Sequence, residues 1–252
     1  MHPVNRFLSA FGVRLSRLNP PPPPPVTPPG FEYLDEQFEQ CRKNNRGFAV
    51  EKRLYFQSGE HPRNYVDFEC AFAAKQLLRE RPAKVMDIGS YRQFIIGLLA
   101  RGEVITLDVR KRTPDCPTET VLTGDAKTIP LPDDSLDAIV SLCAIEHFGL
   151  GRYGDEFDPE GDLKAFREMR RVIKPGGTLI FTTTMTGGRP TIWFNAHRVY
   201  DRAMLDQFVA GMTRVDEEFF SQQTLTPCTE EQLTKGPEWD VYAGCWRKNA
   251  PA

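Results

Sequence analysis

The spacing of apolar residues along the chain changes near residue 82, from a helical pattern to short strand-like runs. Two stretches between residues 31 and 81 have helical spacing, and the second covers residues 65–79. Beyond it, short runs rich in β-branched and aliphatic residues alternate with stretches long enough for helical crossovers. This alternation predicts an α/β fold with a doubly wound, mostly parallel sheet and right-handed connections. The predicted strands cover residues 84–88, 103–109, 118–122, 136–142 and 178–183.

The pattern also predicts what surrounds the fifth strand. Leu163, Phe166, Met169 and Ile173 share one helical face, and the Pro-Gly-Gly sequence at residues 175–177 is expected to end that helix. Two further strands are predicted at residues 215–220 and 240–246, joined by a longer loop. We expect them to form an antiparallel ribbon at the edge of the Rossmann-like sheet.

The N-terminal residues differ in character from the rest. Apolar residues between Val4 and Leu18 recur at helical spacing opposite three arginines, and no acidic residue precedes Glu32. This pattern is typical of a helix on an anionic membrane surface, and packing on its own domain or on a sister subunit is the alternative. Eight of the 21 prolines follow at positions 20–29 and predict a polyproline II linker, or else an SH3-type ligand. We therefore divide the chain into a basic amphipathic helix (1–19), a linker (20–30) and a domain (31–252) with an N-terminal helical extension.

Composition narrows the partners and the compartment. With 32 basic and 34 acidic side chains, the chain lacks the positive field that attracts nucleic acid, so no nucleic-acid partner is expected. No apolar run approaches the roughly 18 residues of a membrane span. The six cysteines form no C-x-x-C pair, which indicates reduced thiols in the cytoplasm. Residues 1–19 would add a peripheral contact at the inner membrane face.

Candidate chemistry lies where the predicted strands end, because ligands bind beyond the carboxyl ends of strands in such sheets. Gly89 follows the first strand and Asp108 ends the second, 19 residues later. That distance is close to the roughly 20 residues at which a carboxylate accepts the hydroxyls of a bound ribose. Dinucleotides need G-x-G-x-x-G, whereas the loop GSYRQF keeps only its first glycine. S-adenosylmethionine carries no phosphate, so it fits this loop better than NAD does.

A third segment adds an Asp-Ala pair, Asp125-Ala126, after the third strand and an acidic turn before the fourth. This order of elements resembles the class I S-adenosylmethionine-dependent methyltransferases, in which the pair faces the adenine. The resemblance covers about residues 84–184, including RVIKPGGTLIF, although Tyr91 and Gln93 stand where many of these enzymes have glycine. It implies S-adenosylmethionine as the cofactor. The implied cofactor-binding residues are Asp87, Gly89, Ser90, Asp108, Asp125 and Ala126.

Two unusual motifs narrow the resemblance. EHFGLGRYGDEFDPEGD (146–162) and FNAHRVY (194–200) are similar to a bacterial family of uncharacterised methyltransferase-like proteins that is often associated with surface-glycan biosynthesis. The acceptor implied by this resemblance is a sugar or glycan precursor, either a small molecule or lipid-linked. The methylated position and the oligomeric state stay open.

Methyl transfer to a hydroxyl requires alignment of the reactants and a group that takes the proton. His147, just past the fourth strand, is the first candidate for that base, and hydrogen bonding to the loop backbone is its alternative role. Glu146 would orient this histidine or bind the cofactor amino group, unless it is a solvated carboxylate at a helix start. His197 is a second candidate base.

Acceptor contacts are expected from two loops. Asn195 and Arg198 are polar candidates, with a structural bridge between loop and helix as the alternative. Arg152 and Tyr153 lie in a glycine-hinged loop, where the guanidinium would bind a carboxylate or phosphate of the acceptor, or else pair with an acidic neighbour such as Asp155. No metal site is predicted, because the acidic residues from 155 to 162 do not follow the ligand register of a calcium loop.

The leading interpretation is an enzyme that transfers a methyl group from S-adenosylmethionine to an oxygen of a sugar or glycan precursor. Because the loop GSYRQF has few glycines, a second interpretation is a binding or scaffold protein that kept the fold and lost catalytic activity. A nucleotide-sugar oxidoreductase is the third, and the missing loop glycines disfavour it.

Overall fold

The computed structural model describes residues 29, 31–56 and 63–250. The chain divides into two compact units, Met1–His61 and Pro62–Ala252. In the first unit, helix α2 (Leu34–Lys43) has no buried residue. The predicted division, with a domain that starts at residue 31, stays a prediction. The predicted helix 1–19 and nearly all of the proline linker lie outside the described residues.

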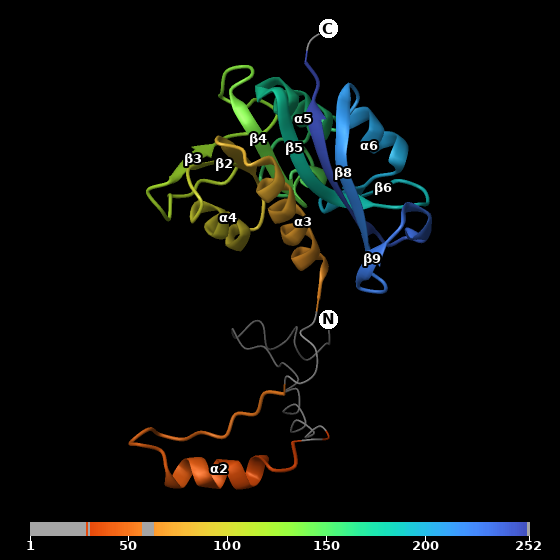
Figure 1. Ribbon diagram of the computed structural model, residues 1–252. Helices are drawn as coiled ribbons and strands as arrows, with labels where there is room; N and C mark the ends of the chain where they lie inside the picture. The colour runs from red at the N-terminus through yellow and green to blue at the C-terminus, as the bar shows by residue number, and fades with distance from the viewer. Residues whose placement is uncertain (1–28, 30, 57–62, 251–252) are drawn as a thin grey trace, which may run out of the picture. The chain divides into compact units, whose positions relative to one another are not determined.

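The second unit is built on an eight-stranded sheet with the order β3-β2-β1-β4-β5-β10-β8-β9 (Figure 1). The first five strands of this order are parallel to one another. The predicted doubly wound, mostly parallel α/β sheet is thus confirmed. Its strands are β1 (Val85–Ile88), β2 (Val104–Asp108), β3 (Glu119–Thr123), β4 (Leu136–Leu142), β5 (Ile173–Met185), β8 (Met212–Ser221), β9 (Thr226–Cys228) and β10 (Asp240–Lys248).

Helices cover both faces of the sheet (Figure 1). One face packs against α3 (Tyr65–Glu80) and α4 (Arg92–Leu99), and the other against α5 (Gly161–Val172) and α6 (Arg202–Phe208). Helix α3 begins with a capping box between Asn64 and Asp67, which satisfies two of the unpaired N–H groups of its first turn. Short 3-10 turns, η2 (Ile145–His147) and η3 (Glu230–Gln232), and the hairpin of β6 (Thr191–Trp193) and β7 (His197–Val199) complete the unit.

The junction between α5 and β5 differs from the expectation. The helix ends at Val172, so Ile173 belongs to β5 and not to the helical face that we assigned to it. Ile173 pairs with Leu136 and Thr178 pairs with Ala138, so the four residues between them form a bulge in the strand. Gly177 is required there, because a Cβ would lie 2.7 Å from the carbonyl oxygen of Asp137.

The predicted antiparallel ribbon is present and is larger than expected. Strand β10 pairs antiparallel with both β5 and β8, and β9 adds a further strand at the edge. Because β10 lies inside the sheet and not at its edge, residues 240–246 are buried without interruption. This explains why the sequence DVYAGCW lacks the alternation of a strand with one solvated face.

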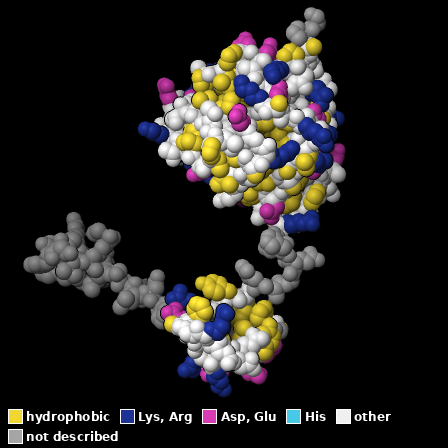
Figure 2. All heavy atoms as spheres, turned by 60° about the vertical axis from the view of Figure 1, so that its left-hand side comes forward, with side chains coloured by type: hydrophobic (Ala, Val, Ile, Leu, Met, Phe, Trp, Pro, Cys, Tyr) yellow, Lys and Arg dark blue, Asp and Glu magenta, His cyan; other side chains and the backbone are white. Residues whose placement is uncertain are grey.

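The surface carries mixed charge. On the face drawn in Figure 2, basic and acidic side chains lie interspersed with apolar ones. Within the part of the chain that the structure describes, no helix has the length and apolarity needed to cross a membrane.

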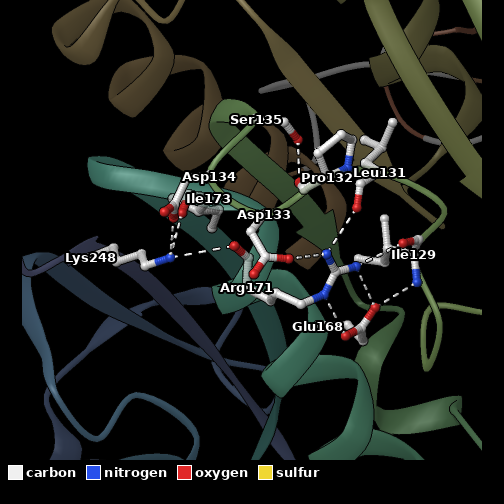
Figure 3. A network of polar contacts seen from close by, with 10 residues as sticks. All are labelled: Ile129, Leu131, Pro132, Asp133, Asp134, Ser135, Glu168, Arg171, Ile173 and Lys248. Carbon is white, nitrogen blue, oxygen red and sulfur yellow. Dashed lines mark hydrogen bonds and ion pairs between the residues drawn. The ribbon is translucent and has the colours of Figure 1, made fainter. Parts of the chain in front are cut away.

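Arg171, near the C-terminal end of α5, holds the segment between β3 and β4 against the helix (Figure 3). Its guanidinium donates to the carbonyl oxygens of Ile129 at 2.8 Å and Leu131 at 2.9 Å. It also pairs with Asp133 at 2.6 Å and with Glu168 at 2.8 Å. Glu168 in turn accepts the backbone N–H of Ile129 at 2.9 Å. One side chain therefore fixes the segment that begins at the strand end carrying Asp125.

Replacing Arg171 by alanine should lower the free energy of unfolding by about 1–3 kcal/mol, because two carbonyl groups and the Glu168 carboxylate lose their donor. Urea denaturation followed by circular dichroism measures this change. Arg167→Ala, on the exposed side of the same helix, is the control and should change it little. Equal effects of the two substitutions would contradict the role given to Arg171.

Candidate functional site

Two adjoining pockets lie where β1, β2, β3 and β4 end at their carboxyl sides. We call them the narrow pocket, which encloses about 530 Å³ including its mouth, and the wide pocket, which encloses about 950 Å³ including its mouth. Strand order reverses between β1 and β4, and open parallel sheets bind ligands at such a point. Four residues line both pockets: Gly89, Arg110, His147 and Tyr153.

The turn after β1 is held by Asp87, Gly89 and Ser90. Gly89 has φ +72°, and a Cβ there would lie 2.9 Å from Ala144 Cβ. Asp87 is fully buried and accepts the Ser90 N–H at 3.3 Å, while its Oδ1 has no hydrogen-bond partner. Burial raises the pKa of Asp87 to about 7. Ser90 lines the wide pocket and Gly89 lines both pockets. Asp87 lines neither pocket and contacts the turn through its hydrogen bond with the Ser90 N–H.

Asp108, Asp125 and Ala126, three of the candidate cofactor-binding residues, all line the narrow pocket. The Asp108 carboxylate is occupied on both oxygens by Arg110, whose Nε lies 3.0 Å from Oδ1 and whose Nη2 lies 2.9 Å from Oδ2. Burial opposes ionisation of Asp108, but the hydrogen bonds from Arg110 outweigh it and lower the pKa. Asp125 lies 3.2 Å from the Lys127 ammonium group. Both acids are therefore held in place by cations close to them in the sequence.

His147 lies at the junction of the two pockets, in the 3-10 turn after β4. Its Nδ1 is 2.7 Å from the carbonyl oxygen of Ala196. Burial lowers the pKa of His147 to about 4, although the bond to that carbonyl opposes the shift. The ring is therefore neutral near pH 7. In the tautomer that donates from Nδ1 to this carbonyl, Nε2 carries the acceptor lone pair. Nη1 of Arg152 also lies 3.3 Å from Nδ1.

His197 lines the wide pocket on β7 and is held among aromatic rings. Its ring centroid is 4.7 Å from that of Trp193 and 5.7 Å from that of Trp239. The centroids of the two histidine rings, His147 and His197, are 6.3 Å apart. Burial lowers the pKa of His197, and its Nε2 is buried without a hydrogen-bond partner. The structure therefore brings both candidate bases to one pocket.

A buried acidic cluster, defined by Glu69, Cys143 and Glu146, lies beside the wide pocket. The Cys143 thiol donates to Glu69 at 2.5 Å, and Glu146 accepts from Thr183 Oγ1 at 3.0 Å. Glu146 Oε1 is 3.9 Å from Nε2 of His147. Burial raises the pKa of both carboxyl groups to about 7. The solvated alternative for Glu146 is thus excluded, because its side chain is only 2% exposed.

The two loops predicted to bind an acceptor have different positions. Arg152 and Tyr153 both line the wide pocket. Arg152 donates to the Ala196 carbonyl oxygen at 3.0 Å and does not pair with Asp155. The Asp155 carboxylate accepts the N–H groups of its own loop at residues 149, 151 and 153. Asp155 therefore stabilises the glycine-hinged loop through its backbone and does not pair with Arg152, which lines the wide pocket.

Asn195 and Arg198 do not line either pocket, and this corrects our expectation. Asn195 is exposed in the turn of the β6–β7 hairpin with φ +60°. The Arg198 guanidinium is buried, donates to the carbonyl oxygens of Phe148 at 2.7 Å and Pro159 at 3.2 Å, and lies 3.4 Å from Asp162. These contacts are of the kind expected for the structural bridge, which was the alternative for Arg198, because buried guanidinium groups need hydrogen-bond acceptors.

Sequence reasoning missed several residues at the site. Glu69 occupies the buried face of α3 together with Phe72, Ala73 and Gln76, and a charged residue at that spacing was a usable signal. Tyr65 and Trp239 come from elements distant in sequence, and no sequence pattern indicated that they lie at the site. Tyr91 lines the wide pocket and leaves the narrow pocket free. Among the residues that the structure describes, no cluster of His, Cys, Asp or Glu could hold a metal ion.

The chain belongs to the family described as Caenorhabditis protein of unknown function, DUF268, whose profile matches residues 107–237. Both motifs that indicated a bacterial methyltransferase-like family, at residues 146–162 and 194–200, lie inside this match. That narrower bacterial family stays a prediction.

The individual proteins similar to this chain share less than a third of their aligned residues with it. A malonyl-(acyl-carrier protein) O-methyltransferase of Methylococcus capsulatus is 29% identical over 46% of this chain and 42% of its own length. An uncharacterised 37.1 kDa protein in a transposon of Streptomyces fradiae is 29% identical over 73% of this chain and 55% of its own. The chain thus spans about half the length of the curated relatives that it matches.

Solved structures share the fold. The 1,6-didemethyltoxoflavin-N1-methyltransferase of Burkholderia thailandensis, crystallised with S-adenosylhomocysteine, superposes with a TM-score of 0.55. The match covers 91% of this chain and 94% of that one at 14% identity. The Rossmann-like methyltransferase fold expected from the sequence is therefore confirmed.

The acidic cluster generates a prediction for stability. The native state keeps the Glu69 proton up to about pH 7, whereas an unfolded chain loses it near the ordinary pKa of 4.5. Stability should therefore fall as pH rises through this window, since the unfolded state then binds fewer protons. Glu69→Gln cannot ionise, so its unfolding free energy should gain about 1–3 kcal/mol relative to wild type between about pH 5 and pH 8.

Urea denaturation at a series of pH values measures this difference. Glu103→Gln, on the exposed surface, is the matched control. Parallel pH curves for wild type and Glu69→Gln would show that Glu69 is ionised in the native state.

Proposed function

We propose that this protein is a methyltransferase that uses S-adenosylmethionine and modifies an oxygen of a sugar or glycan precursor. One observation carries the proposal: the narrow pocket, lined by carboxylates, meets the wide pocket at His147, whose Nε2 can accept a proton in the tautomer that donates from Nδ1 to the Ala196 carbonyl. A methyl donor on one side and a hydroxyl acceptor on the other would meet beside a neutral base.

The residues of the narrow pocket fit this cofactor. Its carboxylates, Asp108, Asp125 and Asp155, outnumber its single arginine. Such a lining disfavours a diphosphate and favours a cationic sulfonium compound. Asp108 would accept the ribose hydroxyls, and the Asp125-Ala126 pair would face the adenine. The same charge balance argues against the oxidoreductase alternative, which needs a dinucleotide.

When bound, the cofactor supplies an electrophilic methyl group on a sulfonium sulfur. His147 would take the proton of the acceptor hydroxyl at Nε2 while the oxygen forms its bond to the methyl carbon, and the carbon–sulfur electron pair stays on sulfur. Glu146, 3.9 Å away, would stabilise the resulting imidazolium. Exclusion of water by the surrounding aromatic rings strengthens these charge interactions.

The wide pocket fits a sugar-like acceptor. Its walls include the aromatic residues Tyr65, Tyr91, His197 and Trp239. Aromatic rings combine an apolar face with polar edges, which suits the alternating surfaces of a sugar ring. Arg152 offers a guanidinium for an acidic group on the same molecule. The acceptor would be a small molecule or lipid-linked, and residues 1–19 would place the cytoplasmic protein at the inner membrane face for the second case.

The binding or scaffold alternative has one observation in its favour, because Arg110 occupies the Asp108 carboxylate. Detection of a methylated product from cell extract would exclude this alternative, and calorimetric titration with S-adenosylhomocysteine tests cofactor binding. We expect micromolar binding, and Asp108→Asn should weaken it about tenfold or more because charged hydrogen bonds to the ribose are lost. Asp206→Asn, exposed on α6, is the control. Absence of heat from folded protein at high micromolar ligand would remove the cofactor and the proposed activity.

The catalytic role has its own test. His147→Ala should lower the methylation rate about 10²–10⁴-fold while cofactor affinity stays within a factor of about two, because the base acts on the acceptor proton. Rates are measured by mass spectrometry with isotope-labelled S-adenosylmethionine and cell-extract acceptors. His197→Ala is compared in parallel. If both variants keep the wild-type rate, neither histidine is the base.

A further inference from the structure

Two guanidinium groups contact one aromatic ring at the mouth of the wide pocket. The central carbon of the Arg110 guanidinium is 4.6 Å from the centroid of Tyr153, and that of Arg152 is 5.6 Å from the same centroid. Both arginines line the wide pocket. Tyr153 therefore contacts two positive side chains that line the wide pocket, and an anion bound there would meet positive charge.

The partners of the two arginines differ. Among the described residues, no carboxylate lies within ion-pair distance of Arg152. Its Nη1 donates to the backbone carbonyl of Ala196 at 3.0 Å and lies 3.3 Å from Nδ1 of His147. Arg110 is bound to Asp108, but its own side chain is 59% exposed, and ion pairs with so exposed a partner are weak. By contrast, Arg92 at the same pocket is held by Asp115 and Glu119. Arg110 and Arg152 are therefore the arginines of this pocket that can turn to a ligand.

We propose that Arg110 and Arg152 form, around Tyr153, a binding site for a phosphate group of the acceptor, and that Arg110 joins it only when the cofactor ribose has displaced it from Asp108. The inference rests on the proposed function, because the ribose must compete for Asp108. Two planar guanidinium forks match the oxygens of a phosphate, and a phosphate monoester offers enough acceptors for both.

The exchange of partners makes binding ordered. Without the cofactor, Arg110 neutralises Asp108, and a phosphate finds only Arg152. With the cofactor, the ribose hydroxyls take over the carboxylate oxygens, and Arg110 is released within contact of the same tyrosine ring. Asp155, in the loop that carries Arg152 and Tyr153, already accepts hydrogen bonds from three backbone N–H groups, so it does not compete for Arg110. Binding of either ligand should thus strengthen binding of the other by the same factor.

Calorimetric titration of the full chain with glucose 1-phosphate, with and without saturating S-adenosylhomocysteine, tests this coupling. We expect the nucleoside to tighten phosphate binding about fivefold or more. A second titration uses phosphatidylcholine vesicles that contain a polyprenyl phosphate. Coupling in the first titration identifies a soluble sugar phosphate, and coupling in the vesicle titration alone identifies a lipid phosphate. Both results support the phosphate site, and its absence from both overturns it.

Three variants separate this inference from the proposed function. Arg110→Gln should abolish the coupling and tighten S-adenosylhomocysteine binding about two- to fivefold, because the competing ion pair is gone. Arg152→Gln should weaken phosphate binding with and without the nucleoside. Lys111→Gln, exposed beside Arg110, is the control for lost positive charge. Nucleoside binding without any coupling would overturn the phosphate site alone, whereas no nucleoside binding would overturn both proposals.

Discussion

The parallel pairing of β1 with β2 and β4 is the constraint on which the rest of the site depends. Ile88 pairs with Leu107 and Asp87 with Val140, so the three strands end together at one edge of the sheet. This register brings Gly89, Asp108 and the turn carrying His147 side by side, although they are far apart in the chain. A shift of one residue would turn these side chains to the opposite faces of the sheet.

Burial at this edge accounts for the unusual charges of the site. Glu69 and Glu146 lie within the core beside a thiol, where the charged form of a carboxylate is unfavourable. The same burial keeps His147 neutral. The histidine that would take the proton of an acceptor is therefore kept neutral by desolvation, whereas the hydrogen bonds from Arg110 lower the pKa of Asp108. Natural proteins commonly give up some stability for such an arrangement.

The sequence predicted the fold well because apolar runs and glycines report backbone period and strand ends directly. Four of the six candidate cofactor-binding residues, Gly89, Asp108, Asp125 and Ala126, line the narrow pocket, since spacing along parallel strands translates into position at one edge. Sequence reasoning failed where a side chain had two possible partners. Both Arg198 and Arg152 had an acceptor-binding and a structural interpretation, and only the three-dimensional structure shows that one guanidinium is buried against backbone carbonyls while the other residue lines the wide pocket. The ion pair of Asp108 with Arg110 was equally beyond a reading based on spacing.

The central claim is that Asp108 holds the ribose of an adenosine cofactor. A crystal structure of the protein with S-adenosylhomocysteine tests it most directly. We expect ribose hydroxyls within hydrogen-bond distance of both Asp108 oxygens, with the Arg110 guanidinium displaced toward the wide pocket. A nucleoside bound elsewhere, with Arg110 still on Asp108, would contradict it.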